Sequence, residues 1–210
     1  MDFTIFFRIF GDYTFRLVAV GTAVLGIVCG VLGCFAVSRR QSLIGDAVSH
    51  SVLPGVVIAF MLTGTKNIFL LLVGATIAGI ISILVVSFFK RNTRADFESI
   101  LATVLSSFFG LGILLLTMVN KQTGGNKAGL DSFISGQVSS LLIGDVVMMI
   151  AVSVALLMLV LLFWKEFKVV SFDKEFADVI GFPSGRLLLF LSMLIVTSII
   201  IGLQTVGVIL

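Results

Sequence analysis

Residues 17–40 read LVAVGTAVLGIVCGVLGCFAVSRR, an apolar run long enough to cross a bilayer, closed by a pair of arginines. The whole chain resembles this stretch, because 59% of its residues are hydrophobic and 12% are charged, against roughly 25% charged in soluble domains. The sequence predicts an all-α polytopic transmembrane bundle rather than a barrel of alternating strands. We expect six spans, at 17–37, 44–63, 68–89, 99–119, 145–163 and 187–210.

Basic residues predict the orientation of these spans. Arginine and lysine gather in cytoplasmic loops, and nine of the fourteen lysines and arginines fall on one side. These are Arg39, Arg40, Lys90, Arg91, Arg94, Lys165, Lys168, Lys174 and Arg186. That side is expected to be the cytoplasm, which places the N-terminus outside a cell membrane. The loops account for the formal charge of +3, so nucleic acid is not an expected partner.

The run RRQSLIGDAVSHSVLPG (39–55) holds the most informative polar residues. Asp46, His50 and Pro54 are spaced by four and share one helical face. Pro54 has no N–H, so the His50 carbonyl loses its helical hydrogen bond. Carboxylate, imidazole and free carbonyl together suit a divalent transition metal. A structural interpretation stays open, in which Asp46 caps a helix starting at Ala47 and His50 is a buried structural histidine.

Glu98 is a second candidate metal ligand. It opens the fourth predicted span on the cytoplasmic side, near the end at which Asp46 enters. The alternative is electrostatic, because a glutamate in a first helical turn is stabilised by the helix dipole. Asp96 is explained equally well in that way.

Residues 171–185, SFDKEFADVIGFPSG, predict a short amphipathic cytoplasmic helix over 171–183. Ser171 or Asp173 can cap it, and Gly181 and Pro183 end it. An apolar stripe runs along one side. Its members are Phe172, Phe176, Val179 and Ile180. One interpretation is a helix lying flat on the bilayer. The mixed charges of the other face favour a docking helix for a soluble partner.

Several motifs of other protein classes are absent from the sequence. There is no GxxxxGK[ST] phosphate loop, no HExxH and no GxSxG elbow, so the chain is not expected to be an enzyme. Residues 130–143 predict a short re-entrant or interfacial helix. The final apolar run reaches Leu210 with no polar tail, and we expect the single domain 1–210 to be incomplete at its C-terminus.

With these residues in view, the chain resembles the membrane permease subunits of manganese, zinc and iron ABC importers. The resemblance rests on 39–55, on ADFESILATVLSSFFGLGILLL (95–116) and on SFDKEFADVIGF (171–182). It implies a second permease copy, a cytoplasmic ATPase and an extracytoplasmic metal-binding protein. It also implies that Asp46, His50 and Glu98 lie on the ion path, with no permanently bound cofactor. The implied ATPase-coupling residues are Ser171, Phe172, Asp173, Glu175, Phe176, Ala177 and Gly181.

Two rival functions stay open at this stage. An ion- or proton-coupled secondary carrier could use the same Asp–His pair as a proton relay, although no inverted repeat of that region is visible. A truncated, non-transporting subunit would only pack against a longer permease. The sequence does not choose among Mn²⁺, Zn²⁺ and Fe²⁺, because carboxylate and imidazole suit all three.

Overall fold

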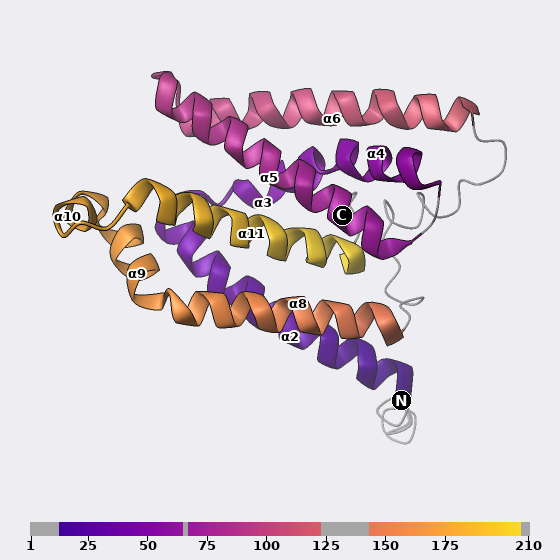
Figure 1. Ribbon diagram of the computed structural model, residues 1–210, viewed down its shortest axis with the longest axis horizontal. Helices are drawn as coiled ribbons and strands as arrows, with labels where there is room; N and C mark the ends of the chain where they lie inside the picture. Colours follow the sequence, from indigo (N-terminus) through magenta and orange to yellow (C-terminus); the bar gives the residue numbers. More distant parts are fainter. Residues whose placement is uncertain (1–12, 65–66, 123–142, 207–210) are drawn as a thin grey trace, which may run out of the picture.

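The computed structural model describes residues 13–64, 67–122 and 143–206, and all its regular elements in these ranges are α-helices (Figure 1). Six candidate membrane spans are present in the described residues, as the hydropathy pattern predicts. The helices are α2 (Tyr13–Ser38), α3 (Ile44–Ser51), α4 (Leu53–Thr63), α5 (Ile68–Asn92), α6 (Phe97–Gln122), α8 (Ile143–Leu162), α9 (Trp164–Phe172), α10 (Lys174–Val179) and α11 (Ser184–Val206).

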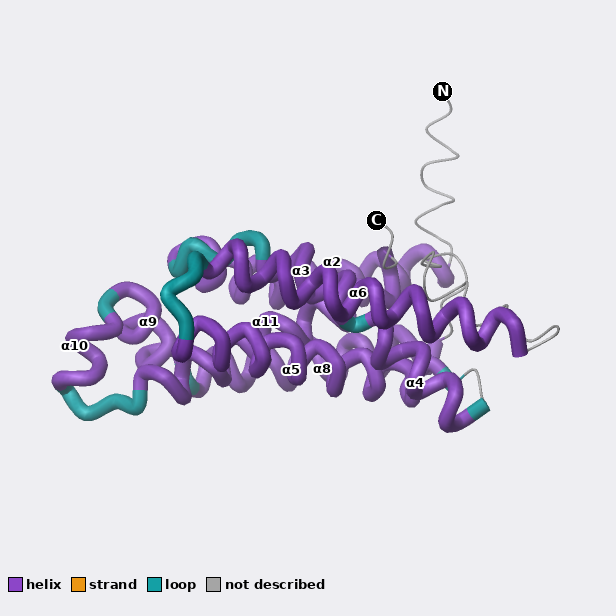
Figure 2. The backbone as a smooth tube through the Cα atoms, turned by 90° about the horizontal axis from the view of Figure 1, so that it is seen from above, coloured by secondary structure: helices purple, strands orange, loops and turns teal. Residues whose placement is uncertain are grey.

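The spans lie side by side in a bundle, with α6 at one edge and α2 and α8 at the other (Figure 1). Helix α11 runs between α2 and α5 and contacts both, so it forms the centre of the bundle. Its side chains Leu191, Val196 and Ile200 are fully buried. Helices α9 and α10 project beyond the spans at one end (Figure 2). This end also holds the α2–α3 and α5–α6 turns, whose arginines and lysines predict the cytoplasmic side.

The second span lies at Ile44–Thr63, as expected, and is interrupted near Pro54. It divides at Val52 into α3 and α4, because Pro54 supplies no N–H to continue the hydrogen-bond ladder. Val52 keeps α-helical angles (φ −80°, ψ −16°), so the two halves still follow one line. The Gly55 N–H bonds to the Val52 carbonyl at 3.0 Å, one residue short of the helical spacing. This divided span is also the most buried of the six, because 61% of its most apolar window lies inside the bundle.

Polar and small residues fasten the divided span to α5. The Ser51 hydroxyl is fully buried and lies 3.0 Å from the Ser82 hydroxyl. Gly55 and Gly74 meet backbone to backbone, so a side chain at either position would overlap the other helix. Small residues permit such close approach in lipid, where packing replaces the hydrophobic effect. The break at Val52 is therefore held inside a tightly packed crossing.

The segment predicted to be cytoplasmic also departs from the sequence-based expectation. The predicted helix at 171–183 is two helices, because Asp173 is extended (φ −143°, ψ 97°) and separates α9 from the six-residue α10. The Asp173 carboxylate accepts the Phe176 N–H at 2.9 Å, which confirms Asp173 as the cap. Helix α9 was not expected as a separate element. The re-entrant helix predicted at 130–143 falls outside the described residues, except for its last position.

Candidate functional site

Asp46 and His50 lie together on α3, one turn apart. The His50 Nε2 is 3.6 Å from the Asp46 Oδ1, which is longer than a hydrogen bond. Two ligands of a tetrahedral metal with bonds of about 2.1 Å are about 3.4 Å apart. The separation in the structure is close to that value, so one ion could bridge the carboxylate and the imidazole with little movement.

The helix start rules out one of the structural interpretations. Helix α3 begins at Ile44, and Asp46 lies inside its first turn rather than capping a helix at Ala47. The Asp46 side chain is 70% exposed and that of His50 32% exposed. His50 is therefore not a fully buried structural histidine. A carboxylate in the first turn remains favourable to the helix dipole, so the position stabilises a negative charge next to the imidazole.

The surroundings of His50 restrict its ring. Phe109 of α6 packs edge-on against the imidazole, with ring centroids 5.3 Å apart and planes at 75°. The Nδ1 atom is buried and has no hydrogen-bond partner among the described residues. On the backbone, Pro54 leaves the His50 carbonyl without its usual donor. Phe109 was not singled out from the sequence, because no spacing rule relates residue 109 to residue 50.

Glu98 lies apart from this pair. His50 faces Phe109, and Leu53 packs where a side chain at Gly112 would be, so α3–α4 and α6 run alongside each other. Within the described ranges, no three histidine, cysteine or acidic side chains are grouped closely enough to hold a metal ion.

The predicted coupling segment presents an apolar surface to solvent. Ala177 is fully buried and anchors α10, and Gly181 ends the helix with φ +91°, a conformation that favours glycine. The four apolar residues of the stripe are exposed. Their exposed fractions are Phe172 76%, Phe176 56%, Val179 85% and Ile180 53%. We name this group the α10 apolar patch. Acidic and basic residues of the segment surround it: Asp173, Lys174, Glu175 and Asp178.

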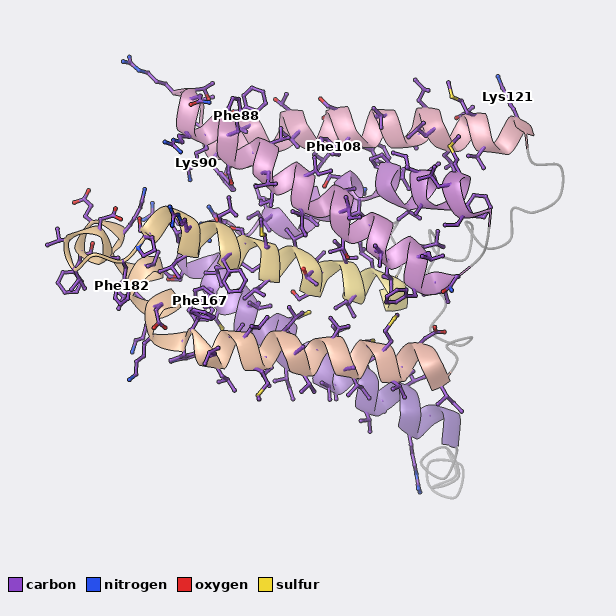
Figure 3. All side chains as sticks on the ribbon, in the orientation of Figure 1. Phe88, Lys90, Phe108, Lys121, Phe167 and Phe182 are labelled. Atoms are coloured by element: carbon purple, nitrogen blue, oxygen red, sulfur yellow. The ribbon has the colours of Figure 1, made fainter. Side chains whose placement is uncertain are left out.

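Aromatic side chains connect this segment to the spans. Phe167 of α9 is buried, and its ring centroid lies 6.2 Å from that of Phe35 on α2 and 5.9 Å from that of Phe190 on α11. Phe163 packs against both Phe167 and Phe190 (Phe167 is labelled in Figure 3). Helix α9 is therefore in direct aromatic contact with α2 and α11.

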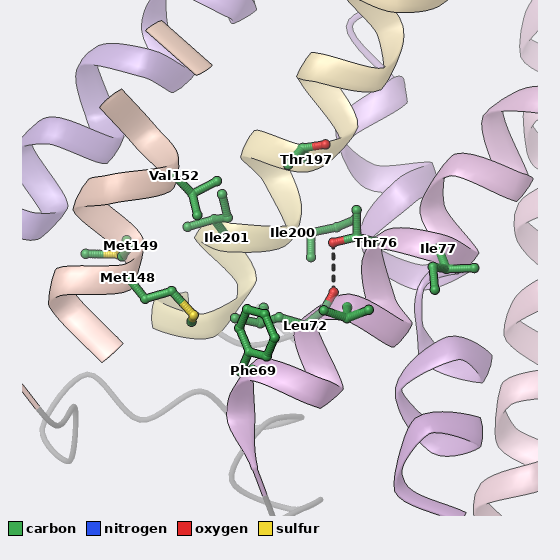
Figure 4. Close-up of a pocket in the computed structure, with 11 residues that line it drawn as sticks. Phe69, Leu72, Thr76, Ile77, Met148, Met149, Val152, Thr197, Ile200 and Ile201 are labelled. Carbon is green, nitrogen blue, oxygen red and sulfur yellow. Dashed lines mark hydrogen bonds between the residues drawn. The ribbon is translucent and has the colours of Figure 1, made fainter. Parts of the chain in front are cut away.

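A separate cavity of about 220 Å³ lies between α5, α8 and α11 (Figure 4). Its lining is apolar except for the hydroxyls of Thr76 and Thr197. Thr76 donates to the Leu72 carbonyl at 2.7 Å and Thr197 to the Met193 carbonyl at 2.8 Å. The lining residues include no carboxylate or imidazole, and the cavity is distinct from the Asp46–His50 pair.

A polytopic helical bundle with a polar pair on a divided span is consistent with a membrane transport protein. Residues 12–210 match the ABC 3 transport family, and the chain belongs to that family. It is a membrane permease subunit of an ABC transporter and not the catalytic chain. The resemblance inferred from the three sequence segments is thereby confirmed.

Two relatives and one solved structure are similar over most of this chain. The zinc transport system membrane protein TroC of Treponema pallidum (strain Nichols) is 48% identical over 203 residues, covering 97% of this chain and 68% of the relative. The manganese transport system membrane protein MntC of Bacillus subtilis (strain 168) is 46% identical over 193 residues, covering 92% and 44% respectively. PsaBC from Streptococcus pneumoniae in complex with Fab matches with a TM-score of 0.77 and 28% identity, covering 96% of this chain and 69% of that chain.

Proposed function

We propose that this permease passes a divalent transition metal ion, manganese or zinc with iron as the third candidate, into the cytoplasm. The observation that carries the proposal is the 3.6 Å separation of His50 Nε2 and Asp46 Oδ1 on a span broken by Pro54. Relatives named for zinc and manganese transport support the choice of substrate class. The donor set of carboxylate, imidazole and carbonyl suits first-row metals.

The described residues of one chain supply only part of a complete ligand set. Transition metals commonly take four or more ligands, and the described residues bring together one carboxylate and one imidazole. The Asp46 side chain is 70% exposed, so it is open to a second molecule. A second permease copy related by a two-fold axis would place its own Asp46 and His50 opposite the first pair. Glu98, in the first turn of α6 and not grouped with this pair, would then contact the ion after it leaves this site.

The α10 apolar patch is the proposed docking surface for a cytoplasmic ATPase. Exposed phenylalanine and valine on a six-residue helix are costly unless a partner covers them. Docking would bury the patch, with the coupling residues predicted from Ser171 to Gly181 contributing its edges. Movement of α10 would reach α9, and then α2 and α11 through Phe167. An extracytoplasmic binding protein would deliver the ion at the opposite end of the bundle, where the N-terminus is expected.

Uptake of radioactive manganese and zinc tests the proposal directly. Cells lacking the gene would be complemented with wild type, Asp46→Ala or His50→Ala. We expect wild type alone to restore uptake, while all three proteins reach the membrane in equal amounts. Co-expression with an ATPase inactivated in its own catalytic residues provides the second arm. Uptake that persists with either alanine variant would remove the site, and uptake that needs no active ATPase would favour a secondary carrier.

A further inference from the structure

The two ring nitrogens of His50 lie in different surroundings. Nε2 is 3.6 Å from the Asp46 Oδ1. Nδ1 is buried, and it has no hydrogen-bond partner among the residues that the structure describes. Since the His50 side chain as a whole is 32% exposed, its exposed surface belongs to atoms other than Nδ1. The imidazole is therefore oriented with Nδ1 toward the protein and Nε2 toward the carboxylate.

The side chains next to His50 are bonded elsewhere or carry no lone pair. The Ser49 hydroxyl donates to a carbonyl of its own helix at 2.7 Å, and the Ser51 hydroxyl lies 3.0 Å from that of Ser82. Phe109 has its ring centroid 5.3 Å from that of the imidazole. An aromatic ring accepts only a weak hydrogen bond through its π face. The contact that α6 makes with the His50 ring is therefore apolar.

This arrangement affects the form of His50 that binds a metal ion. A neutral imidazole carries one proton, on either nitrogen. In the free protein the Asp46 carboxylate favours the form with the proton on Nε2, while Nδ1 keeps its lone pair. An ion that binds Nε2 takes the lone pair of that atom, so the proton leaves Nε2, one arrives at Nδ1, and the ring stays neutral. The new N–H would be buried without an acceptor, which is unfavourable.

We propose that Phe109 is a positioning residue that withholds an acceptor from His50 Nδ1, so that the site holds its ion weakly and releases it. Here Asp46 and His50 are taken as the ion site, so this role of Phe109 rests on the proposed function. Metal-bound histidines normally donate their second N–H to a carbonyl or carboxylate, and loss of that partner lowers metal affinity about 10-fold to 100-fold. A transport site benefits from that loss, because it must bind weakly enough for the ion to leave.

The proton position at His50 can be measured directly, because it is the only histidine in the chain. The permease is purified without a histidine tag and with isotope-labelled histidine. Its ring nitrogens are recorded by NMR at mildly alkaline pH, where imidazoles are neutral. We expect the proton on Nε2 in the metal-free protein and on Nδ1 after zinc is added. A proton on Nδ1 in the metal-free protein would overturn the proposal, since it would reveal an acceptor there.

Placing an acceptor beside the ring tests the consequence for affinity. Phe109→Gln supplies a side-chain carbonyl, so zinc affinity measured by isothermal titration should rise at least about tenfold. Uptake of radioactive zinc at saturating concentration should fall, because release becomes slower. Phe108→Gln adds the same amide one position along α6 and, as the matched control, should change neither quantity. Phe109→Leu removes the ring without supplying an acceptor and should not raise the affinity.

Two results would contradict this role of Phe109, provided that the variants melt at the wild-type temperature in detergent. One is an unchanged zinc affinity in a Phe109→Gln protein whose spectrum shows the proton on Nδ1. The other is an equal rise in affinity with Phe109→Leu, which would assign the effect to removal of the ring. Failure of the proposed function looks different, because zinc would then bind the wild type without perturbing either nitrogen of His50.

Discussion

The divided span α3–α4 and the segment α9–α10 are both broken helices, but their breaks have opposite consequences. Pro54 interrupts the hydrogen bonds of the first while Val52 stays α-helical, so the span continues in line and remains the most buried of the six. Extended Asp173 interrupts the second and turns the chain. The first leaves the Asp46 carboxylate exposed, and the second leaves four apolar side chains exposed. The proposed ion site and the proposed docking site therefore differ in the kind of group that each presents.

The largest expected effect concerns manganese binding, which should depend on Asp46 and not on Phe176. Asp46→Asn keeps the shape of the side chain and removes its charge, so it should weaken manganese binding by more than about 100-fold, beyond the usual effect of losing an outer-shell partner. Phe176→Asp should leave binding unchanged. Isothermal titration of the purified permease measures both, and wild type should bind one ion per two chains. Equal loss in both variants would mean that the two regions are not separate sites.

The converse test concerns the ATPase. Phe176→Asp places a charge in the α10 apolar patch, where burial against a partner would desolvate it, so co-purification of the ATPase should fall at least tenfold. Lys168→Gln lowers the net charge by the same one unit at an exposed position of α9 outside the patch and serves as the matched control. A similar fall in both variants would assign the effect to overall charge, and no fall in either would remove the docking proposal.

The smallest expected effect comes from Pro54→Ala. Alanine restores an N–H that can bond to the His50 carbonyl and straighten the ladder. If that carbonyl contributes to the ion site, manganese affinity should fall about threefold to tenfold, while the melting temperature stays equal or rises. Unchanged affinity in a protein that is at least as stable would leave Asp46 and His50 as the only ligands of the chain.

Local sequence was sufficient for the spans and for the Asp46–His50 pair. A segment in lipid must satisfy its own backbone hydrogen bonds, so about twenty apolar residues form a helix whatever its neighbours are. The pair is separated by one helical turn, so its proximity follows from helix geometry alone. The Asp173 cap and the Gly181 stop were predictable for the same reason, because each acts on bonds within a few residues.

Local sequence was misleading where two short-range signals competed. The apolar stripe from Phe172 to Ile180 predicts one continuous helix, yet the Asp173 cap starts a new helix inside it. In the second span, the sequence predicted the hydrogen bond lost at Pro54, and the structure adds that the helix divides at Val52. The error at 171–183 concerns the strength of a single capping residue against the periodicity around it, which a pattern of spacings does not measure.

Sequence by itself determined the membrane class of this chain, its spans and the adjacency of Asp46 and His50, because each depends on residues within one or two helical turns. Tertiary structure alone decided that Phe109 packs on His50 and that Glu98 is not grouped with Asp46 and His50. These relations join helices far apart in the chain. Their register is set by how small and large side chains interlock, as at Gly55 with Gly74 and Leu53 with Gly112, and no local rule contains that information.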